Sequence, residues 1–327
     1  MSRSLINKIL YSCMFALLLY IALVLWSDWT QLVSALTDFP WLWLPVVIAL
    51  TWVNYIGRLV KWNWYMGLLE VDISRWDSTR IFGIGMLMVM TPGKAGEFLK
   101  SYMVRNVSGT PMSVTAPAVL AERVTDGMAM LLLASIGLFA FPNQTARIVA
   151  TIVAIGFVCG IIIIQIRPLA LWFLGIGQKL PIINRIADPL YEFYESSYII
   201  FNARNLMIAL TIGVISWLAE GVAYGIVLIG FGVPFDLNTL LIAIFIFSIS
   251  TVIGAVVAAP GGLGGVEGSL FTLSISILSI PAVLATAAAL LIRFCTLWMG
   301  VLVGVVSFLL WSDLLAGASE ASDLAES

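Results

Sequence analysis

The chain has 327 residues, 61% of them hydrophobic and 10% charged, with a formal net charge of −2 and a mean hydropathy of +1.06. Soluble domains average about a quarter charged residues, and several apolar stretches here exceed the roughly 18 residues that cross a bilayer, so we predict an integral membrane protein. The small net charge argues against a nucleic-acid partner, and the lack of a Walker-type phosphate loop argues against nucleotide-driven transport by this chain.

Two residue types that often carry chemistry are scarce. Histidine, the usual proton carrier near neutral pH and the commonest metal ligand, is absent from the sequence. The three cysteines, Cys13, Cys159 and Cys295, are far apart in apolar segments, where we expect small buried hydrophobic residues and not disulfides or ligands. We therefore predict no metal site, no cofactor and no catalytic residues.

The apolar segments of the first half are Ile9–Trp26, Trp41–Leu59, Ile81–Met90, Ser113–Phe141 and Ile148–Ile166. The first follows two cations as a signal peptide would, but it lacks a small-residue cleavage site, so we interpret it as a retained span. Residues 28–39 connect it to the second segment, whose end, Arg58 to Trp64, is expected to form an aromatic and basic belt at the membrane interface. The third segment is too short to cross, which predicts one arm of a re-entrant hairpin whose return carries Lys100 and Arg105.

A less apolar connector, residues 167–205, separates the two halves and is expected to lie on the membrane surface. The apolar segments of the second half are Leu206–Phe231, Leu237–Ala258, Ser269–Ile280 and Ala282–Trp311. We therefore predict a single membrane domain over residues 1–312, with halves at about 1–166 and 206–312, followed by an acidic disordered tail over 313–327.

Lys and Arg accumulate on cytoplasmic loops, and in this arrangement nearly all loop cations fall on one side of the membrane. Arg147 is the one loop cation on the other side. We therefore predict a multi-pass protein of the cell membrane with both termini in the cytoplasm. The first hairpin enters from the cytoplasm and a second, around residue 260, from outside, although Leu237–Ala258 is also long enough for a full span. Opposite entry is what an inverted-topology repeat requires.

Two similar motifs interrupt the apolar pattern, one in each half. Thr91–Glu97 (TPGKAGE) and Ala259–Glu267 (APGGLGGVE) each combine a Pro-Gly break with further glycine and a glutamate. Proline lacks an amide donor and glycine favours other backbone conformations, so a helix cannot pass either motif undisturbed. In a membrane, such backbone is tolerated only where it is buried in protein or lines a watery cavity. Paired interruptions predict a binding site between the two halves.

Ionisable side chains occur at depths where each costs several kcal/mol, about 2.5–3.5 on the insertion scale, unless it faces protein or water. They are Arg58, Glu97, Glu122, Arg123, Asp126, Glu220, Glu267 and Arg293. Glu122 and Asp126, four residues apart, share one helical face, and Arg123 is about 100° from Glu122. Two interpretations stay open: structural salt bridges that hold the re-entrant loops, or a hydrated cavity for a charged headgroup. We favour the cavity because acids, bases and glycine breaks occur together.

The glycines of both motifs offer successive backbone amides at the start of a half-helix; they are Gly93, Gly96, Gly261, Gly262, Gly264 and Gly265. There the amides and the helix dipole favour an anion such as a phosphate or carboxylate. Lys94 would add a direct phosphate contact, whereas the competing interpretation of each Pro-Gly break is a tight turn. In the last segment, Gly300 and Gly304 are expected to form a close helix-packing contact.

These motifs resemble the signatures of a known family. Pro92–Glu97, Glu122–Asp126 (ERVTD) and Pro260–Glu267 resemble, in the same order, motifs of the lysylphosphatidylglycerol synthase transmembrane-region family, over roughly Lys8 to Trp311. The resemblance implies an all-helical membrane domain with re-entrant helices that moves phospholipid or glycolipid headgroups between leaflets. Two-part members add a soluble aminoacyl-transferase domain, which is not found here before Ser327, so the synthase activity is not carried over. Stand-alone relatives are associated with varied lipids, including polyprenyl-linked sugars.

The sequence thus predicts an all-α, polytopic bundle that acts as a lipid flippase and not as an enzyme. Its partner is a membrane lipid, either a phospholipid or a polyprenyl-linked glycolipid. Two alternatives stay open: a non-catalytic partner that presents lipid to a separate synthase or glycosyltransferase, and an intramembrane transferase with Glu or Asp as general base. The resemblance makes Glu97, Glu267 and the Glu122, Arg123 and Asp126 cluster the leading substrate-binding candidates. Arg58, Glu220 and Arg293 are added from membrane depth alone.

Overall fold

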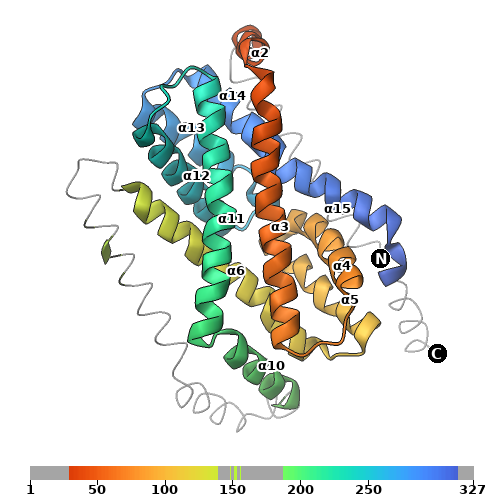
Figure 1. The fold of residues 1–327 in the computed structure, drawn as a ribbon. Coiled ribbons are helices and arrows are strands. Elements are labelled where there is room, and N and C mark those ends of the chain that lie inside the picture. Colours follow the sequence, from red (N-terminus) through yellow and green to blue (C-terminus); the bar gives the residue numbers. More distant parts are fainter. Residues whose placement is uncertain (1–28, 139–147, 149–150, 153–154, 156–186, 316–327) are drawn as a thin grey trace.

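The computed structural model describes residues 29–138, 148, 151–152, 155 and 187–315. In these ranges every regular element is a helix and none is a strand, which confirms the predicted all-α class (Figure 1). The α-helices are α2 (Trp29–Asp38), α3 (Leu44–Leu68), α4 (Arg75–Leu87), α5 (Leu99–Ser108), α6 (Met112–Leu138), α10 (Ala187–Ile200), α11 (Ala203–Gly230), α12 (Leu237–Val257), α13 (Gly265–Leu278), α14 (Ala282–Arg293) and α15 (Met299–Leu310). The shorter turns are η1 (Trp41–Trp43), η2 (Met88–Met90), η3 (Pro92–Phe98), η4 (Pro260–Gly262), η5 (Phe294–Trp298) and η6 (Ser312–Leu315).

Five helical stretches among the described residues are long and apolar enough to cross a membrane. They are Trp41–Leu68, Ala203–Gly230, Leu237–Val257, Pro260–Leu278 and Ala282–Leu310. Helix α6 has a similar length, 27 residues, but carries three charged residues near its middle. The protein is therefore a multi-pass, all-α membrane protein.

Several predictions concern residues outside the described ranges. The retained span Ile9–Trp26, nearly all of Ile148–Ile166, most of the connector 167–205 and the tail beyond residue 315 are in this group, as are Cys13 and Cys159. Cys295 is described, and its side chain is a buried free thiol, as expected.

The connection over residues 28–39 contains a helix that the apolar pattern did not predict. Trp29–Asp38 forms α2. This stretch contains neither glycine nor proline before Pro40, and its Leu32 side chain is only 1% exposed. Burial of that apolar side chain in the main core therefore supports a short helix that charge counting alone cannot reveal.

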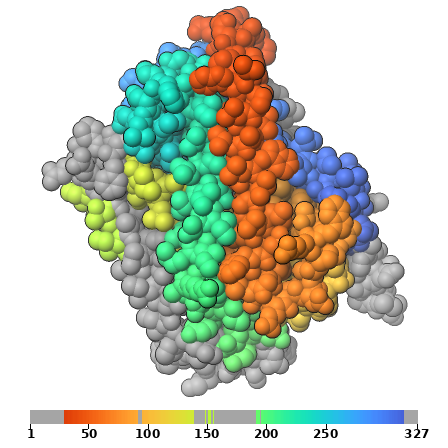
Figure 2. Space-filling view, in the orientation of Figure 1, coloured from red at the N-terminus to blue at the C-terminus, as the bar shows by residue number. Residues whose placement is uncertain are grey.

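Two long antiparallel helices, α3 and α11, lie side by side along one face of the molecule (Figure 2). The two approach closely at Gly57, where an added Cβ atom would lie only 2.1 Å from the Ser216 hydroxyl oxygen. Phe39, shortly before α3, packs on Phe231, directly after α11, with ring centroids 4.9 Å apart. The start of α3 therefore lies beside the end of α11, and the segments that follow these helices leave from opposite ends of the pair.

Hairpin 1, formed by α4, η2, η3 and α5, follows the end of α3. Ser74 caps α4 by accepting the Asp77 amide at 3.0 Å. The arms have 13 and 10 residues, so they reach about 20 and 15 Å, less than a hydrocarbon core of about 30 Å. At the break, the Thr91 hydroxyl accepts the Gly96 amide at 2.8 Å and donates to the Met88 carbonyl at 2.6 Å. The backbone groups freed by Pro92 are thus partly satisfied within the hairpin.

Hairpin 2, formed by α12, η4 and α13, follows the end of α11. Asp236 caps α12 by accepting the Thr239 amide at 2.6 Å. At the break, Gly261, Gly262 and Gly264 have φ angles of 62°, 69° and 82°, which residues with a side chain rarely adopt. Helix α12, with 21 residues, is long enough for a full span, whereas α13, with 14, is about 21 Å long.

The tips of the two hairpins meet inside the protein. Met90 of hairpin 1 and Leu263 of hairpin 2 are buried in one small apolar cluster, together with Leu297. Because the hairpins follow opposite ends of the α3–α11 pair, they approach this point from opposite directions (Figure 1). This arrangement is the one that an inverted repeat requires. The repeat itself and the re-entry of either hairpin into the membrane stay predictions.

The final helical run follows the predicted bounds but is interrupted. Helices α14 and α15 are joined by η5, one turn of π-helix. In α15, Gly304 packs on α4, since an added Cβ atom would lie 2.4 Å from the Leu87 amide nitrogen. Gly300, one turn earlier, faces the Tyr55 hydroxyl. The predicted close-packing role of Gly300 and Gly304 is confirmed.

We expect Gly304→Ala to lower the stability of the protein by about 1–3 kcal/mol, because the new methyl group must push α15 away from the α4 backbone. The measurement is thermal unfolding in detergent. Gly268→Ala is the matched control: a Cβ atom there meets nothing within 4 Å, and alanine favours the α13 helix. Equal melting temperatures for the two variants would contradict the packing argument.

Candidate functional site

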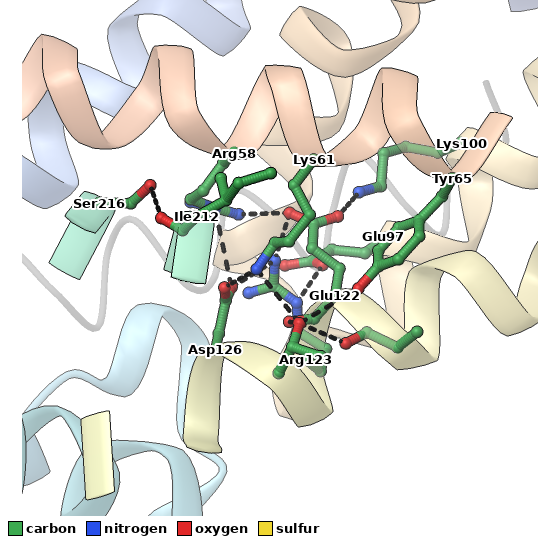
Figure 3. A network of polar contacts seen from close by, with 12 residues as sticks. Arg58, Lys61, Tyr65, Glu97, Lys100, Glu122, Arg123, Asp126, Ile212 and Ser216 are labelled. Carbon is green, nitrogen blue, oxygen red and sulfur yellow. Dashed lines mark hydrogen bonds and ion pairs between the residues drawn. The ribbon is translucent and has the colours of Figure 1, made fainter. Parts of the chain in front are cut away.

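Seven charged side chains form one buried network between α3, α6 and hairpin 1, shown in Figure 3. The charge network consists of Arg58 and Lys61 from α3, Glu97 and Lys100 from hairpin 1, and Glu122, Arg123 and Asp126 from α6. All but Arg123 are at least nine-tenths buried. Four cations and three carboxylates at this depth compensate one another, which is the condition for ionised groups inside a membrane.

Glu122, which is fully buried, lies at the centre of the charge network. Its Oε1 atom is 3.1 Å from Arg58 Nη2 and 2.7 Å from Arg123 Nη2, and its Oε2 atom accepts a hydrogen bond from Lys100. One carboxylate therefore joins α3, α6 and hairpin 1.

Asp126, one turn later on the same face of α6, makes a second set of pairs. It accepts a hydrogen bond from Lys61, and its Oδ2 atom lies 3.3 Å from Arg123 Nη2 and 3.8 Å from Arg58 Nε. Lys61 also donates to the Thr125 hydroxyl at 3.2 Å. The predicted common face of Glu122 and Asp126 is confirmed, and it faces α3.

The predicted interface belt at the end of the second segment is wrong. Helix α3 continues to Leu68, and Lys61 and Trp62 within it are completely buried. Lys61 pairs with Asp126 of α6, and the Trp62 ring lies against the Lys100 ammonium, so neither side chain lies at the membrane surface. Ion pairing inside the protein offsets part of the cost of burying the cations. Arg58, Lys61 and Lys100 are therefore buried ion-pair partners and not loop cations, so they carry no information on orientation.

Lys100 reaches the charge network across hairpin 1. Its ammonium lies 4.5 Å from the centroid of the Trp62 ring. Its aliphatic chain crosses Gly85, where a Cβ atom would lie 2.7 Å from Lys100 Cδ. The glycine of one arm thus leaves room for the lysine of the other, and a cation–π contact adds to the ion pair with Glu122.

Glu97, the glutamate of the first motif, is 2% exposed. Its Oε2 atom lies 3.0 Å from Arg123 Nε. Neither carboxylate oxygen accepts a hydrogen bond from a described residue. The Glu97 side chain is thus connected to α6 by an ion pair and not by a hydrogen bond.

A separate ion pair holds hairpin 2. Arg293 Nε donates to Glu267 Oε1 at 2.7 Å, and Arg293 Nη2 donates to the Gly261 carbonyl at 2.6 Å. Glu267 Oε2 in turn accepts the Gly264 amide at 2.8 Å. The Gly264 amide, which we predicted from the sequence to bind a phosphate, therefore already donates to Glu267. This favours a structural role for the Glu267–Arg293 pair. Gly265 packs closely against α12, because a Cβ atom added to it would lie 3.1 Å from Gly254 Cα.

A cavity of about 440 Å³ lies between the two halves, bounded by α3, α6, α11, both hairpins and the run from α14 through η5 to α15. Its walls are mostly apolar, with side chains such as Met130, Trp217, Phe247 and Leu297. The predicted site residues that line it are Arg58, Arg123, Asp126, Glu220, Gly261, Gly262 and Arg293.

The other predicted site residues do not line the cavity. Glu97 and Glu122 lie behind its wall in the charge network, and Gly96, Gly264, Gly265 and Glu267 belong to the two breaks. Gly93 and Lys94 lie in η3, and the position of the Lys94 side chain is outside the described part of the protein.

Two guanidinium groups offer open donors to the cavity. Arg58 and Arg123 line it, and each donates its hydrogen bond to the described carboxylates through Nη2 and none through Nη1. Neither Nη1 atom is among the polar atoms sealed from solvent. A guanidinium with free N–H groups binds carboxylates and phosphates with matched geometry. The cavity is therefore suited to an anion.

Sequence reasoning did not select Lys61, Lys100 or Tyr55 as site residues. Tyr55 lines the cavity and donates a hydrogen bond to the Thr296 carbonyl in the π-helical turn η5. One local signal was available: Tyr55, Arg58 and Lys61 are spaced by three residues on an apolar helix, which places them along one face. Within the described ranges, no group of three or more His, Cys, Asp or Glu side chains is placed to hold a metal ion.

Comparison with known proteins agrees with this architecture. The sequence model of the family described as "Lysylphosphatidylglycerol synthase TM region" matches residues 13–304. The chain belongs to this family. It is also similar to a UPF0104 membrane protein of Methanothermobacter thermautotrophicus, with 24% identity over 324 residues that cover 91% of this chain and 92% of the relative. A second UPF0104 membrane protein of that organism is 22% identical, over 85% of this chain and 88% of the relative. A third, from Methanocaldococcus jannaschii, is 23% identical, over 67% of this chain and 91% of the relative.

Proposed function

We propose that this protein is a lipid translocase that moves a phosphate-bearing headgroup between the leaflets of the cell membrane, through the cavity between its two halves. The observation that carries the proposal is the combination of mostly apolar walls with the open guanidinium donors of Arg58 and Arg123. A charged headgroup needs such donors inside a membrane, because it leaves its hydration shell in water.

The charges on the cavity wall support an anionic ligand. Three guanidinium groups, Arg58, Arg123 and Arg293, stand against two carboxylates, Asp126 and Glu220. A phosphodiester with one negative charge would balance this set. Polar groups of the headgroup, such as hydroxyls, would then bind the carboxylates.

The size of the cavity supports entry of the headgroup alone. A volume of about 440 Å³ is at the small end of ligand sites, which range from about 300 to 1,000 Å³. It is too small for a whole phospholipid, so the acyl chains would stay in the bilayer. The two hairpins approach each other from opposite directions, which suits alternating exposure of the cavity to the two leaflets. In this proposal both chain termini lie in the cytoplasm. In this proposal the protein translocates the lipid and does not alter it chemically.

The decisive experiment is leaflet exchange in liposomes that contain the purified full chain and a fluorescent phosphatidylglycerol. We expect exchange well above that of protein-free liposomes. Arg123→Gln is expected to slow it about tenfold or more, since a charged hydrogen bond contributes about 1.5–3 kcal/mol. Arg105→Gln is the matched control, because Arg105 is exposed on α5 and does not line the cavity.

The same preparation separates the alternatives. No exchange of phosphatidylglycerol or of a polyprenyl phosphate, with and without a proton gradient, would contradict the proposal. Conversion of the lipid by the purified protein would indicate an intramembrane transferase. Co-purification of a lipid-modifying enzyme, with no exchange by the isolated chain, would indicate a protein that presents lipid to that enzyme.

A further inference from the structure

The two motif glutamates are held in different ways. Glu267 accepts hydrogen bonds from Arg293 Nε at 2.7 Å and from the Gly264 amide at 2.8 Å. Glu97 is just as deeply buried, but neither of its oxygens accepts a hydrogen bond from the described part of the protein, and its ion pair is with Arg123 Nε at 3.0 Å. Buried carboxylates are normally hydrogen-bonded, so Glu97 is held more weakly than Glu267.

Arg123, which holds Glu97, is also the most exposed member of the charge network. Its side chain is 21% exposed, against 11% or less for the others. Its Nε atom faces Glu97, and its Nη2 atom lies 2.7 Å from Glu122 and 3.3 Å from Asp126. Arg123 also lines the cavity, and its Nη1 atom donates no hydrogen bond to a described residue, so one guanidinium connects the cavity to hairpin 1.

We infer that Arg123 and Glu97 form a ligand-operated latch: an anionic phosphate group that binds Arg123 from the cavity loosens Glu97 and thereby frees η3, the tip of hairpin 1, to move, while Lys100 on α5 stays paired with Glu122. The identity of that anion as a lipid headgroup rests on the function proposed above. Hairpin 2 stays in place during this step, because Arg293 and the Gly264 amide both hold Glu267.

The physical basis is competition for one cation. A buried carboxylate whose counter-charge turns toward another anion is left uncompensated, at a cost of several kcal/mol, and this cost is relieved when the carboxylate moves to water. Glu97 lies in η3, at the tip of hairpin 1, so its movement carries the first break with it. Because Met90 of that hairpin packs with Leu263 of hairpin 2, the movement would open the contact between the tips.

Competition predicts the direction of a mutational effect. By linkage, if the anion weakens the Arg123–Glu97 pair, then Glu97 weakens binding of the anion. Glu97→Gln is therefore expected to tighten binding about tenfold, whereas loss of a merely structural contact would leave binding unchanged or weaken it. Binding is measured on the full chain in detergent with a short-chain phosphatidylglycerol. Short-chain phosphatidylcholine serves as the zwitterionic control, and glycerol 3-phosphate serves as the headgroup without acyl chains.

Hydrogen exchange tests the movement itself. In the wild-type protein, phosphatidylglycerol is expected to raise amide exchange about tenfold in residues 95–98, at the tip of hairpin 1, and to leave residues 265–278 unchanged. Glu97→Gln is expected to show the raised exchange without lipid. Glu192→Gln, on the exposed side of α10, is the matched control and is expected to change neither binding nor exchange.

Each outcome decides the question. The latch is overturned if a folded Glu97→Gln protein binds the anion as well as, or more weakly than, the wild type. It is also overturned if the anion does not change amide hydrogen exchange at the tip of hairpin 1 in the wild-type protein. If glycerol 3-phosphate acts as well as the lipid, the latch stands and responds to the phosphate group alone. Should Glu97→Gln fail to fold, the wild-type exchange experiment still decides. If the anion binds and opens the tip of hairpin 1 but no lipid moves between the leaflets, the translocase is refuted and the latch is kept. If lipid moves between the leaflets but Glu97→Gln does not bind the anion more tightly, the latch is refuted and the translocase is kept.

Discussion

Replacing Glu122 by alanine is expected to destabilise the protein by about 3–5 kcal/mol, the range measured when one partner of a buried ion pair is removed. The side chain is completely buried and pairs with Arg58, Lys100 and Arg123. Without it, four cations of the charge network face only two carboxylates. Part of the loss comes from hairpin 1, because the Lys100 contact connects that hairpin to α6.

The measurement is the yield of monodisperse protein and its melting temperature in detergent. Asp313→Asn is the matched control, because Asp313 pairs with Arg80 at 3.7 Å with 67% of its side chain exposed, and exposed pairs contribute about 0–1 kcal/mol. Glu122→Gln should fall between the two, since the amide oxygen can still accept hydrogen bonds. A Glu122→Ala protein as stable as the Asp313→Asn protein would show that the network contributes nothing to folding.

The features that local chemistry determines could be predicted from the sequence. Pro92 and Pro260 each remove a backbone donor, and both helix breaks are found at those positions. Glu122 and Asp126 share a face because α-helical periodicity places them there. Composition and the length of the apolar segments predicted a membrane protein, and the family resemblance implied that it is all-α.

The features that depend on tertiary partners could not be predicted in this way. Arg58 pairs with a carboxylate 64 residues away, and no local pattern shows that these charges face protein and not the membrane surface. The same holds for α2, which gains its stability from the burial of Leu32, and for η5, whose Thr296 carbonyl accepts the Tyr55 hydroxyl. Whether Glu97 or Glu267 is tightly held depends on hydrogen-bond geometry that the similar motifs conceal.

Arg293→Met is expected to destabilise the protein by about 3–5 kcal/mol and to abolish most leaflet exchange, because Glu267 is left buried without its cation. The Gly261 carbonyl loses its donor as well. The double variant Arg293→Met with Glu267→Gln removes both charges, while the glutamine oxygen can still accept the Gly264 amide. If the pair is structural, as the geometry of hairpin 2 indicates, the double variant should recover the melting temperature and at least half of the exchange rate.

This comparison separates the two interpretations of the buried charges that the sequence left open. Recovery of stability without recovery of exchange would contradict a purely structural pair and would assign Arg293, which also lines the cavity, to the headgroup. Recovery of both would confine recognition of the anion to Arg58 and Arg123, the other two arginines that line the cavity. The two motifs, although similar in sequence, would then differ in role: the second fixes its hairpin through Glu267, and the first carries the glutamate that the anion displaces.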